Sequence, residues 1–439
     1  MIVTNARILT FDSVNTVIDS GTVETHPDGT ITSVRTSTSA ARGAVDAQGR
    51  LLMPALINCH THLYGTLARG ISLPGRPPKN FSEILKKLWW RLDRALNDDD
   101  VYYSALVGLI DSAKCGVGTL VDHHSSPNAC PGSLDRIEQA FREVGLRGVL
   151  CYETSDRNGA AQALEGIREN VRFIERIRDN PGDGMIAATF GLHASFTLGD
   201  RTLRRCLEAN ESLRAGFHVH VAEDRCDAGA AKRLCDLGIL DERSLAAHCV
   251  HVTPPEIASL ARRRVNVVHN PQSNCNNAVG AAKLLEMMRR GVLVGLGSDG
   301  YTPRMWDEFK TAFHVQKLVA GDPRVAYSEA YAAAFLNNRT IVKNLWGMDI
   351  GRIEPGAKAD LILVDYYPPT PLTPGNIFGH LLFGIANAPI DTLIVNGRPI
   401  VRDRKCVTVD ERAIAARASE RARALWHRCP APTLMTTHP

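Results

Sequence analysis

The chain has 439 residues, of which 44% are hydrophobic and 22% charged, so it has enough apolar side chains for a sizeable core and is too balanced in composition for a disordered chain. Lys and Arg number 51 against 47 Asp and Glu, and the formal charge of +4 gives no reason to expect nucleic-acid or anionic-membrane binding. No run approaches the roughly 18 apolar residues of a membrane span, and the first residues lack the pattern of a signal peptide. We expect a soluble, cytoplasmic protein whose function lies in a pocket.

The cysteine pattern indicates free thiols. Eleven cysteines lie between Cys59 and Cys429, and no two of them form a CxxC pair. This spacing favours buried thiols under reducing conditions over a disulfide framework or a thiolate zinc site. Because base-modifying zinc deaminases need a PCxxC pair beside their HxE motif, the pattern also argues against that deaminase fold.

Both ends of the chain predict short β-strands. Apolar segments separated by turn-forming residues lie at 1–9, 22–24, 31–35, 359–364, 393–395 and 399–401. Asn396-Gly397 is typical of a tight hairpin turn between the last two segments. We expect residues 1–54 and 359–439 to form one small β-sandwich domain.

Between these ends, apolar strands alternate with longer helical stretches. Eight strand candidates lie at 51–58, 119–122, 147–152, 186–192, 217–221, 244–247, 265–268 and 292–297. Eight parallel strands with helices between them make a (β/α)8 TIM barrel, so we expect an α/β fold with this barrel over residues 55–358.

Three helices are predicted from their periodicity and caps. Residues 81–96 place apolar side chains on one helical face, the acidic run after Asn97 offers caps for a helix over 101–114, and Asp410 is an N-cap for a helix over 412–428. We expect Trp89 and Trp90 to pack in the core or an interface. The basic residues of 412–428 predict an ordinary solvated helix.

Every candidate barrel strand ends with a titratable side chain. In such a barrel the catalytic groups lie at the C-terminal ends of the strands. Because buried polar groups need partners, so many of them converging on one mouth favour a functional site. These strand-end residues are His60 and His62; Asp122, His123 and His124; Glu153; His193; His220 and Glu223; His248; His269; and Asp299.

A metal site is predicted from four of these residues. His60 and His62 lie two residues apart on one face of a strand, where both can bind one metal ion. His218 and His220 also share a face; we choose His220 as the third ligand because it lies nearer the mouth. Asp299 completes a set that suits one Zn²⁺ or Fe²⁺, whose bound water would ionise near pH 7 to a hydroxide nucleophile.

Other strand-end residues have two interpretations each. Glu223 follows His220 by three residues and could face a substrate, and His248 is either a fifth ligand or a hydrogen-bond donor to the hydroxide. His269 opens a polar turn that is either a substrate-facing loop or a capped turn. The same alternatives, ligand recognition or local hydrogen bonds, hold for Asp122, His123, His124, Glu153, Asp156 and Arg157.

Taken together, these motifs resemble the amidohydrolase superfamily, and within it the mononuclear aminohydrolases that include adenosylhomocysteine, guanine, cytosine and triazine deaminases. The matching segments span most of the chain: 53–55, 60–62, 220–223, 247–251, 269–274, 297–300 and 356–361. A closer resemblance, to the aminohydrolase group called SsnA, lies in 88–93, 122–128, 151–157 and 365–371. It implies a link to purine or selenium metabolism, and Ala55 departs from the family's usual Gly.

The resemblance implies a role for each candidate residue. His60, His62, His220 and Asp299 would bind one divalent metal ion, Zn²⁺ or else Fe²⁺. Asp299 would also take a proton from the metal-bound water, Glu223 would protonate a ring nitrogen, and His248 would stabilise the developing oxygen charge. His193 and His269 would line the substrate pocket, while the binuclear members' carboxylated Lys is absent from 189–195.

The expected activity is hydrolytic deamination of an amino-substituted N-heterocycle, purine-like first, with release of ammonia. This is a metal-dependent hydrolase acting on C–N bonds other than peptide bonds, and analogy with related barrels suggests a homodimer. One alternative keeps the scaffold but hydrolyses a cyclic amide or displaces chloride from a triazine. A second alternative is a catalytically silent, metal-binding scaffold.

Overall fold

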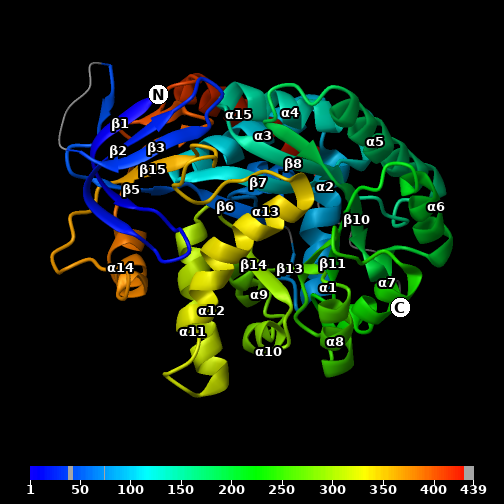
Figure 1. The fold of residues 1–439 in the computed structure, drawn as a ribbon. Coiled ribbons are helices and arrows are strands. Elements are labelled where there is room, and N and C mark those ends of the chain that lie inside the picture. Colours follow the sequence, from blue (N-terminus) through cyan, green and yellow to red (C-terminus); the bar gives the residue numbers. More distant parts are fainter. Residues whose placement is uncertain (38–42, 74, 430–439) are drawn as a thin grey trace, which may run out of the picture.

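The computed structural model describes residues 1–37, 43–73 and 75–429, and it has two parts (Figure 1). A barrel of strands is surrounded by helices, and a β-sheet built from both ends of the chain lies beside it. Residues 38–42 and 430–439 of the predicted β-domain fall outside the described residues. The boundaries 54/55 and 358/359 between the two domains stay a prediction.

The barrel contains nine parallel strands in the described residues. They fill eight positions, because β9 and β10 follow one another in a single position. Two sheets, ordered β6-β7-β8-β9 and β10-β11-β12-β13-β14, meet at both edges through parallel bridges between Thr61 and Asp299 and between Thr154 and Leu192. The predicted (β/α)8 architecture is thereby confirmed. Its strands are β6 (Leu56–Thr61), β7 (Val117–His124), β8 (Arg147–Tyr152), β9 (Ile186–Ala188), β10 (Phe190–Ala194), β11 (Phe217–Val221), β12 (Leu245–His248), β13 (Asn266–His269) and β14 (Leu293–Leu296).

A buried asparagine closes each junction between the two sheets. Asn338, on α13 (Asn338–Trp346), donates through Nδ2 to the Ile57 carbonyl at 2.8 Å and accepts from the Leu296 amide at 2.7 Å. Asn170, on α5 (Ala160–Asp179), accepts from the amides of Tyr152 at 2.9 Å and Gly191 at 3.0 Å and donates to both of their carbonyls. Helix side chains thus satisfy backbone groups where the strand ladder is interrupted.

Two predicted strands are each divided in the structure. The apolar run 51–58 contains β5 (Leu51–Pro54), which pairs with β1 and β15, and only from Leu56 does the chain join the barrel as β6. The run 186–192 is interrupted at Thr189, between β9 and β10. Both runs are apolar throughout because each half is buried, and burial does not reveal that the chain changes pairing partners.

The β-domain is one nine-stranded sheet, ordered β18-β17-β16-β15-β5-β1-β2-β3, with β4 paired to β1. The chain just before β15 hydrogen-bonds to the β2–β3 turn: the Ala359 amide donates to the Gly29 carbonyl, and the Ile31 amide to the Ala357 carbonyl, both at 2.8 Å. The predicted sandwich is therefore a single sheet curled over one core. Its strands are β1 (Ile2–Leu9), β2 (Val17–Thr25), β3 (Ile31–Thr36), β4 (Val45–Asp46), β5, β15 (Leu361–Val364), β16 (Ile390–Val395), β17 (Arg398–Arg402) and β18 (Lys405–Cys406).

A buried ion pair links the two parts of the chain. Arg147 of β8 donates to Asp360 at 2.7 Å through Nε and to the Asn396 side chain at 2.9 Å through Nη2. Asp360 also accepts from the Asn396 amide at 2.8 Å. Asn396 and Gly397 have φ of 50° and 72°, which confirms the predicted hairpin turn.

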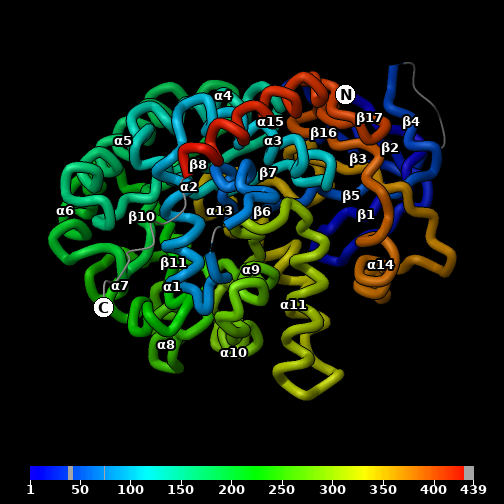
Figure 2. Tube along the Cα trace, turned by 180° about the vertical axis from the view of Figure 1, so that it is seen from behind, coloured from blue at the N-terminus to red at the C-terminus, as the bar shows by residue number. Residues whose placement is uncertain are grey.

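Helices cover the outside of the barrel (Figures 1 and 2). The predicted helix over 81–96 consists of α1, a π-helical segment (Leu85–Trp89) and α2, and the predicted cap of α3 is confirmed by a capping box between Asn97 and Asp100. No helix of the described residues combines the length and apolar composition that a membrane crossing needs. The remaining bounds are α1 (Phe81–Ile84), α2 (Trp90–Ala95), α3 (Asp98–Lys114), α4 (Ser133–Val144), α6 (Asp200–Asn210), α7 (Ala230–Leu237), α8 (Pro254–Arg262), α9 (Pro271–Asn276), α10 (Leu284–Arg289), α11 (Met305–Ala320), α12 (Tyr327–Tyr331), α14 (Ile377–Phe383) and α15 (Glu411–Arg428).

The C-terminal helix α15 lies against α3 (Figure 2). Asp410 caps it as predicted, accepting from the amides of Arg412 and Ala413. Near its C-terminal end, the Trp426 indole donates to the Leu67 carbonyl at 2.8 Å, and Arg91 of α2 donates to the Cys429 carbonyl at 2.9 Å. The C-terminal helix therefore packs against segments from the first quarter of the sequence.

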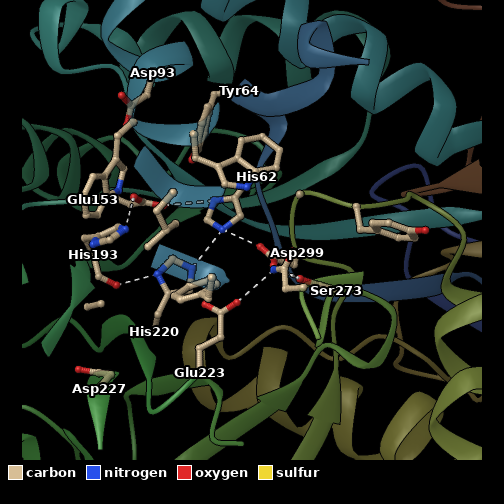
Figure 3. Close-up of a pocket in the computed structure, with 18 of the residues that line it drawn as sticks. His62, Tyr64, Asp93, Glu153, His193, His220, Glu223, Asp227, Ser273 and Asp299 are labelled. Carbon is tan, nitrogen blue, oxygen red and sulfur yellow. Dashed lines mark hydrogen bonds and ion pairs between the residues drawn. The ribbon is translucent and has the colours of Figure 1, made fainter. Parts of the chain in front are cut away.

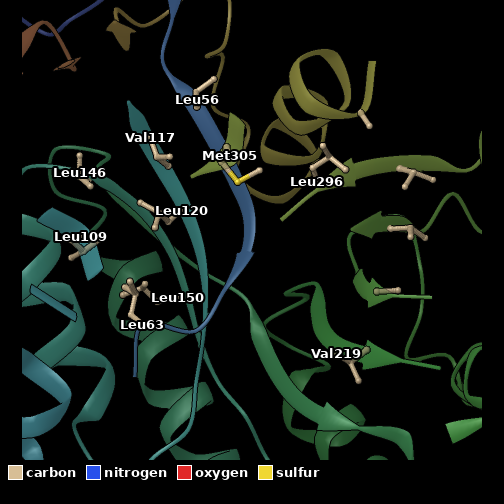
Figure 4. Close-up of a cluster of buried hydrophobic side chains, with 14 of the residues drawn as sticks. Leu56, Leu63, Leu109, Val117, Leu120, Leu146, Leu150, Val219, Leu296 and Met305 are labelled. Carbon is tan, nitrogen blue, oxygen red and sulfur yellow. The ribbon is translucent and has the colours of Figure 1, made fainter. Parts of the chain in front are cut away.

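The main core lies between the barrel strands and the surrounding helices (Figure 4). Leu56 of β6, Leu120 of β7, Leu150 of β8 and Leu296 of β14 belong to one cluster of buried hydrophobic side chains. Close packing of this kind makes the strands rigid. Residues at the strand ends are consequently held in fixed relative positions.

Candidate active site

The four predicted metal ligands lie close together at the C-terminal end of the barrel, and Figure 3 shows three of them, His62, His220 and Asp299. The Nε2 atom of His62 lies 3.1 Å from Nε2 of His220 and 2.9 Å from Oδ1 of Asp299. Nε2 of His60 lies 3.6 Å from the same carboxylate oxygen. The end of β6, the end of β11 and the turn after β14 thus place four ligand atoms near one another.

These residues belong to overlapping groups of potential ligands. One group joins His60, His62, His123 and His220, and another joins His60, His220, His248 and Asp299, with all ligand atoms of a group within 4.8 Å of one another. His220, which we chose over His218, belongs to both of these groups, whereas His218 occurs with His123 and Cys151 in a third group.

The imidazole rings are oriented by hydrogen bonds at Nδ1. That atom donates to the His123 carbonyl at 2.6 Å in His62 and to the His193 carbonyl at 2.7 Å in His220. In His248 it donates to the Asn274 side chain at 2.9 Å. Fixing Nδ1 as the donor leaves the Nε2 lone pair of each ring available, as a metal ligand requires.

The chemistry of this group fits a divalent metal ion. Nε2 of His60 and Nε2 of His248 are buried and have no hydrogen-bond partner among the described residues. Buried polar atoms are otherwise almost always paired. Three or four imidazole nitrogens and a carboxylate facing one point are a ligand set for Zn²⁺ or Fe²⁺.

The backbone around these ligands adopts conformations that are costly for residues with side chains. His248 and Asp299 have φ of 71° and 54°. Such left-handed non-glycine residues cluster at active sites, where the surrounding fold holds them in place. Next to Asp299, a Cβ atom on Gly297 would lie 2.8 Å from the backbone nitrogen of His60, so only glycine allows this approach of β14 to β6.

Glu223 lies beside the ligand group, just after β11. One of its oxygens is 3.6 Å from Nε2 of His248, and the other accepts from Asn277 at 3.4 Å. Asn277 also donates to Ser273, whose hydroxyl donates to Asp299. Glu223 and Asp299 are therefore two neighbouring carboxyl groups with different hydrogen-bond partners.

A cavity opens from this site. It encloses about 750 Å³, part of which is open to solvent. His62, His220, Glu223 and Asp299 lie on its polar side, and aromatic and aliphatic side chains form much of the remaining wall (Figure 3). This composition, apolar walls with a few polar groups that converge, is typical of a small-molecule pocket. The aromatic and aliphatic residues of the wall include Tyr64, Phe81, Leu85, Trp89, Trp90, Phe196 and Tyr301.

Residues 51–400 match the amidohydrolase family over most of the chain. This chain is an amidohydrolase. It is 33% identical over 403 residues to the 5-methylthioadenosine/S-adenosylhomocysteine deaminase of Desulforudis audaxviator, covering 88% of this chain and 90% of that protein. It is 30% identical over 441 residues to the 5'-deoxyadenosine deaminase of Methanosarcina mazei, covering 97% and 98% of the two chains.

Solved structures share the fold of this amidohydrolase. An adenosine deaminase from Xanthomonas campestris with bound zinc superposes with a TM-score of 0.83 at 23% identity, covering 96% of this chain and 98% of that one. Atrazine chlorohydrolase from Arthrobacter aurescens, complexed with zinc, gives 0.77 at 19% identity, covering 96% and 99%. Family and relatives together make the chain a metal-dependent hydrolase acting on C–N bonds.

Burial and local charges separate the pKa values of the two carboxyl groups in the amidohydrolase. Burial raises the pKa of Glu223 well above its usual range, and the charge of Asp299 adds to this. Burial also opposes the charge of Asp299, but the imidazoles of His60 and His62 beside it outweigh this and hold its pKa well below the usual range. Burial thus favours the protonated form of Glu223, and the adjacent imidazoles favour the anionic form of Asp299.

Of the four predicted substrate-binding residues, one lines the cavity and three lie outside its wall. His193 lines the cavity. His123 and His269 are fully buried outside its wall, and Arg157 pairs with Asp93 next to the wall. The amidohydrolase therefore offers the pocket one of these four side chains directly.

Part of the cavity wall consists of residues whose role was not predictable from sequence patterns. Trp89 and Trp90, which were expected to pack in a core or interface, both line the cavity. Trp89 is the last residue of the π-helical segment and Trp90 is the first residue of α2. Asp227 was not predicted either; its carboxylate accepts from the amides of Ala222 and Phe196, both at 2.9 Å. Leu88–Asp93 carried the only sequence signal for this wall.

Proposed function

We propose that this amidohydrolase hydrolytically deaminates an amino-substituted N-heterocycle, purine-like first, and releases ammonia. The observation that carries the proposal is the pair formed by Glu223, a buried carboxyl group with a raised pKa, and Asp299, a buried carboxylate with a lowered one. Two such groups with pKa values pushed apart supply the acid and the base that deamination needs. The named activities of the relatives support the same class of substrate.

His60, His62, His220 and Asp299 would hold the metal ion, and Zn²⁺ is our first choice, with Fe²⁺ as the alternative. A divalent ion at this point supplies Lewis acidity that lowers the pKa of a water. Two structural neighbours, described as zinc-bound, support this choice of metal. A homodimer follows from the resemblance to related barrels. The cytoplasm is proposed because all eleven cysteines are unpaired, which suits a reducing compartment.

The chain's own residues would move the protons. Asp299 accepts a proton from the attacking water, whose oxygen bonds to the amino-bearing ring carbon. Glu223 donates a proton to the adjacent ring nitrogen, and His248 stabilises the charge that develops on the new oxygen. The carbon–nitrogen bond then breaks as Asp299 passes its proton to the amino group, which leaves as ammonia, while the proton of the new hydroxyl returns to Glu223 and a ring carbonyl forms.

Replacing Glu223 by Gln tests the proposal. We expect unchanged metal content and a loss of turnover of about 10²- to 10⁴-fold, the range for removing a general acid. Metal analysis and an ammonia assay over purines, pterins, pyrimidines and triazines provide both measurements from one preparation. The exposed Glu211→Gln serves as the matched control. Full activity of Glu223→Gln rejects the assigned role, and release of chloride or a ring-opened product in place of ammonia rejects deamination.

A further inference from the structure

The cavity wall contains acidic side chains and no strongly basic ones. Among the described residues that line the cavity there are five acidic side chains and neither a Lys nor an Arg. They are not confined to the metal-facing end: Asp93 and Asp227 lie apart from the His62, His220 and Asp299 group in Figure 3. The five acidic residues are Asp93, Glu153, Glu223, Asp227 and Asp299, and burial raises the pKa of Glu153, Glu223 and Asp227.

Arg157, a cation just behind the cavity wall, is already neutralised. Its Nη2 forms an ion pair with Asp93 and donates to Ser125 at 3.0 Å, and Ser125 in turn donates to Asp93 at 3.1 Å. The side chains of Arg157 and Asp93 are only 8% and 1% exposed. The guanidinium group also lies 5.5 Å from the ring centroid of Trp90, which forms part of the cavity wall. Asp93 thus occupies the guanidinium that an anionic substrate would need.

The rest of the wall suits uncharged or cationic groups. Phe81, Trp89, Trp90, Phe196 and Tyr301 provide aromatic surfaces that bind planar rings and favour cations over their faces. An anion entering this part of the space would lose its hydration beside aromatic surfaces and the Asp93 carboxylate, with no Lys or Arg of the described wall to pair with, which costs several kilocalories per mole.

We propose that this pocket accepts heterocycles whose substituent beyond the ring is uncharged or cationic, and excludes phosphate- or carboxylate-bearing ones, with the Asp93–Arg157 pair as the determinant of this selectivity. The proposal rests on the deaminase function and specifies its substrate class. It concerns the end of the substrate away from the amino group that is removed.

A charge series on one aminopurine nucleoside tests the proposal with the unaltered protein. The members are 5'-amino-5'-deoxyadenosine, 5'-deoxyadenosine and adenosine 5'-monophosphate, which differ at a single position. We expect kcat/KM for ammonia release from the first two to exceed that for the monophosphate by at least about 100-fold. Equal or better turnover of the monophosphate overturns the proposal and leaves deamination intact.

Two variants of the pair separate charge from structure. Asp93→Asn frees the guanidinium of Arg157, so we expect the discrimination against the monophosphate to fall by at least about tenfold. Arg157→Gln removes the same ion pair without leaving a cation, so the discrimination should stay as large or grow. A change in the same direction in both variants would show that the pair acts only on structure and would overturn its assigned role.

Failure of the proposed function gives a different result. If no nucleoside and no member of the heterocycle panel releases ammonia from the metal-loaded protein, deamination is rejected, and the charge selectivity that rests on it is rejected too. Ammonia release from the monophosphate at the rate of the neutral nucleoside rejects the selectivity alone.

Discussion

His218 distinguishes His60 from the other imidazoles of the site. His62 and His220 donate to backbone carbonyls, whereas Nδ1 of His60 meets Nε2 of His218 at 2.8 Å. Nδ1 of His218 in turn faces the Cys151 thiol at 3.6 Å. If His60 is to keep its Nε2 lone pair for a metal ion, His218 has to accept at Nε2 and carry its proton at Nδ1.

Loss of this acceptor is expected to weaken metal binding. We predict that His218→Leu lowers metal affinity about 10- to 100-fold, the usual effect of losing a partner of a ligating histidine. His218→Gln places an amide oxygen where Nε2 was and should retain most of the affinity. Competition with a chelator measures both variants. Equal affinity of His218→Leu and the unaltered protein would contradict the orienting role.

Single residues of the site were predictable where position along a strand determines direction. His60, His62, His220 and Asp299 follow from the location of catalytic groups at strand ends, and the structure brings all four together. Trp89 and Trp90 were assigned to packing because helical periodicity shows that a side chain is covered and does not show whether protein or a cavity covers it. Pairing of Asp93 with Arg157 joins residues 64 positions apart, which local patterns cannot reveal.

The secondary-structure elements of the barrel depend on asparagines that belong to none of its strands. Asn170 alone serves four backbone groups of Tyr152 and Gly191, on two neighbouring strands of different sheets. Its loss would leave the two amides buried without partners, at about 1–3 kcal/mol each, and would remove one of the bonds to each carbonyl, which also accepts from the Thr154 amide.

Asn170→Ala is therefore expected to lower the free energy of unfolding by at least about 3 kcal/mol. Urea denaturation measures the change. The exposed Arg168, on the same helix, provides the control: Arg168→Ala should change stability by less than about 0.5 kcal/mol. Similar stability of the two variants would show that solvent or neighbouring groups replace the asparagine at the junction.

Strand and helix positions were largely predictable, whereas strand partners were not. Apolar runs, caps and the Asn396-Gly397 turn located the elements because they depend on neighbouring residues. The divisions at Ala55 and Thr189 depend on which sheet each half joins. That choice is made by contacts far apart in the sequence.

A buried ion pair between Arg147 and Asp360 links the barrel to the β-domain, and neither charge would have a partner without the other. Arg147 is 1% and Asp360 3% exposed, and Asn396 hydrogen-bonds to both. Removing one partner of such a buried pair leaves an uncompensated charge, which costs about 3–5 kcal/mol.

We expect Arg147→Met to cost about 3–5 kcal/mol in free energy of unfolding. Adding Asp360→Asn removes the stranded charge and keeps an acceptor for the Asn396 amide, so the double variant should recover at least about 2 kcal/mol of this loss. Denaturant titration of the four proteins of the cycle decides the question. A double variant no more stable than Arg147→Met would mean that shape, and not charge, couples the parts.

The barrel and its β-domain follow from the alternation of elements and from the strand-rich ends, and the family match and structural neighbours agree with that architecture. The curling of the terminal strands into one sheet was not predictable, since strand patterns are the same for a sandwich and for a folded single sheet. The division into residues 1–54 with 359–439 and residues 55–358 remains a prediction.

Helix α15 has a consequence for protein engineering. It contacts Leu67 and Arg91, which flank the segment that carries Trp89 and Trp90, although no residue of the helix lines the cavity. Substitutions in this helix are therefore expected to change ligand selectivity from a distance. Libraries that vary the residues on its inner face would alter the shape of the barrel mouth and leave every reacting group unchanged.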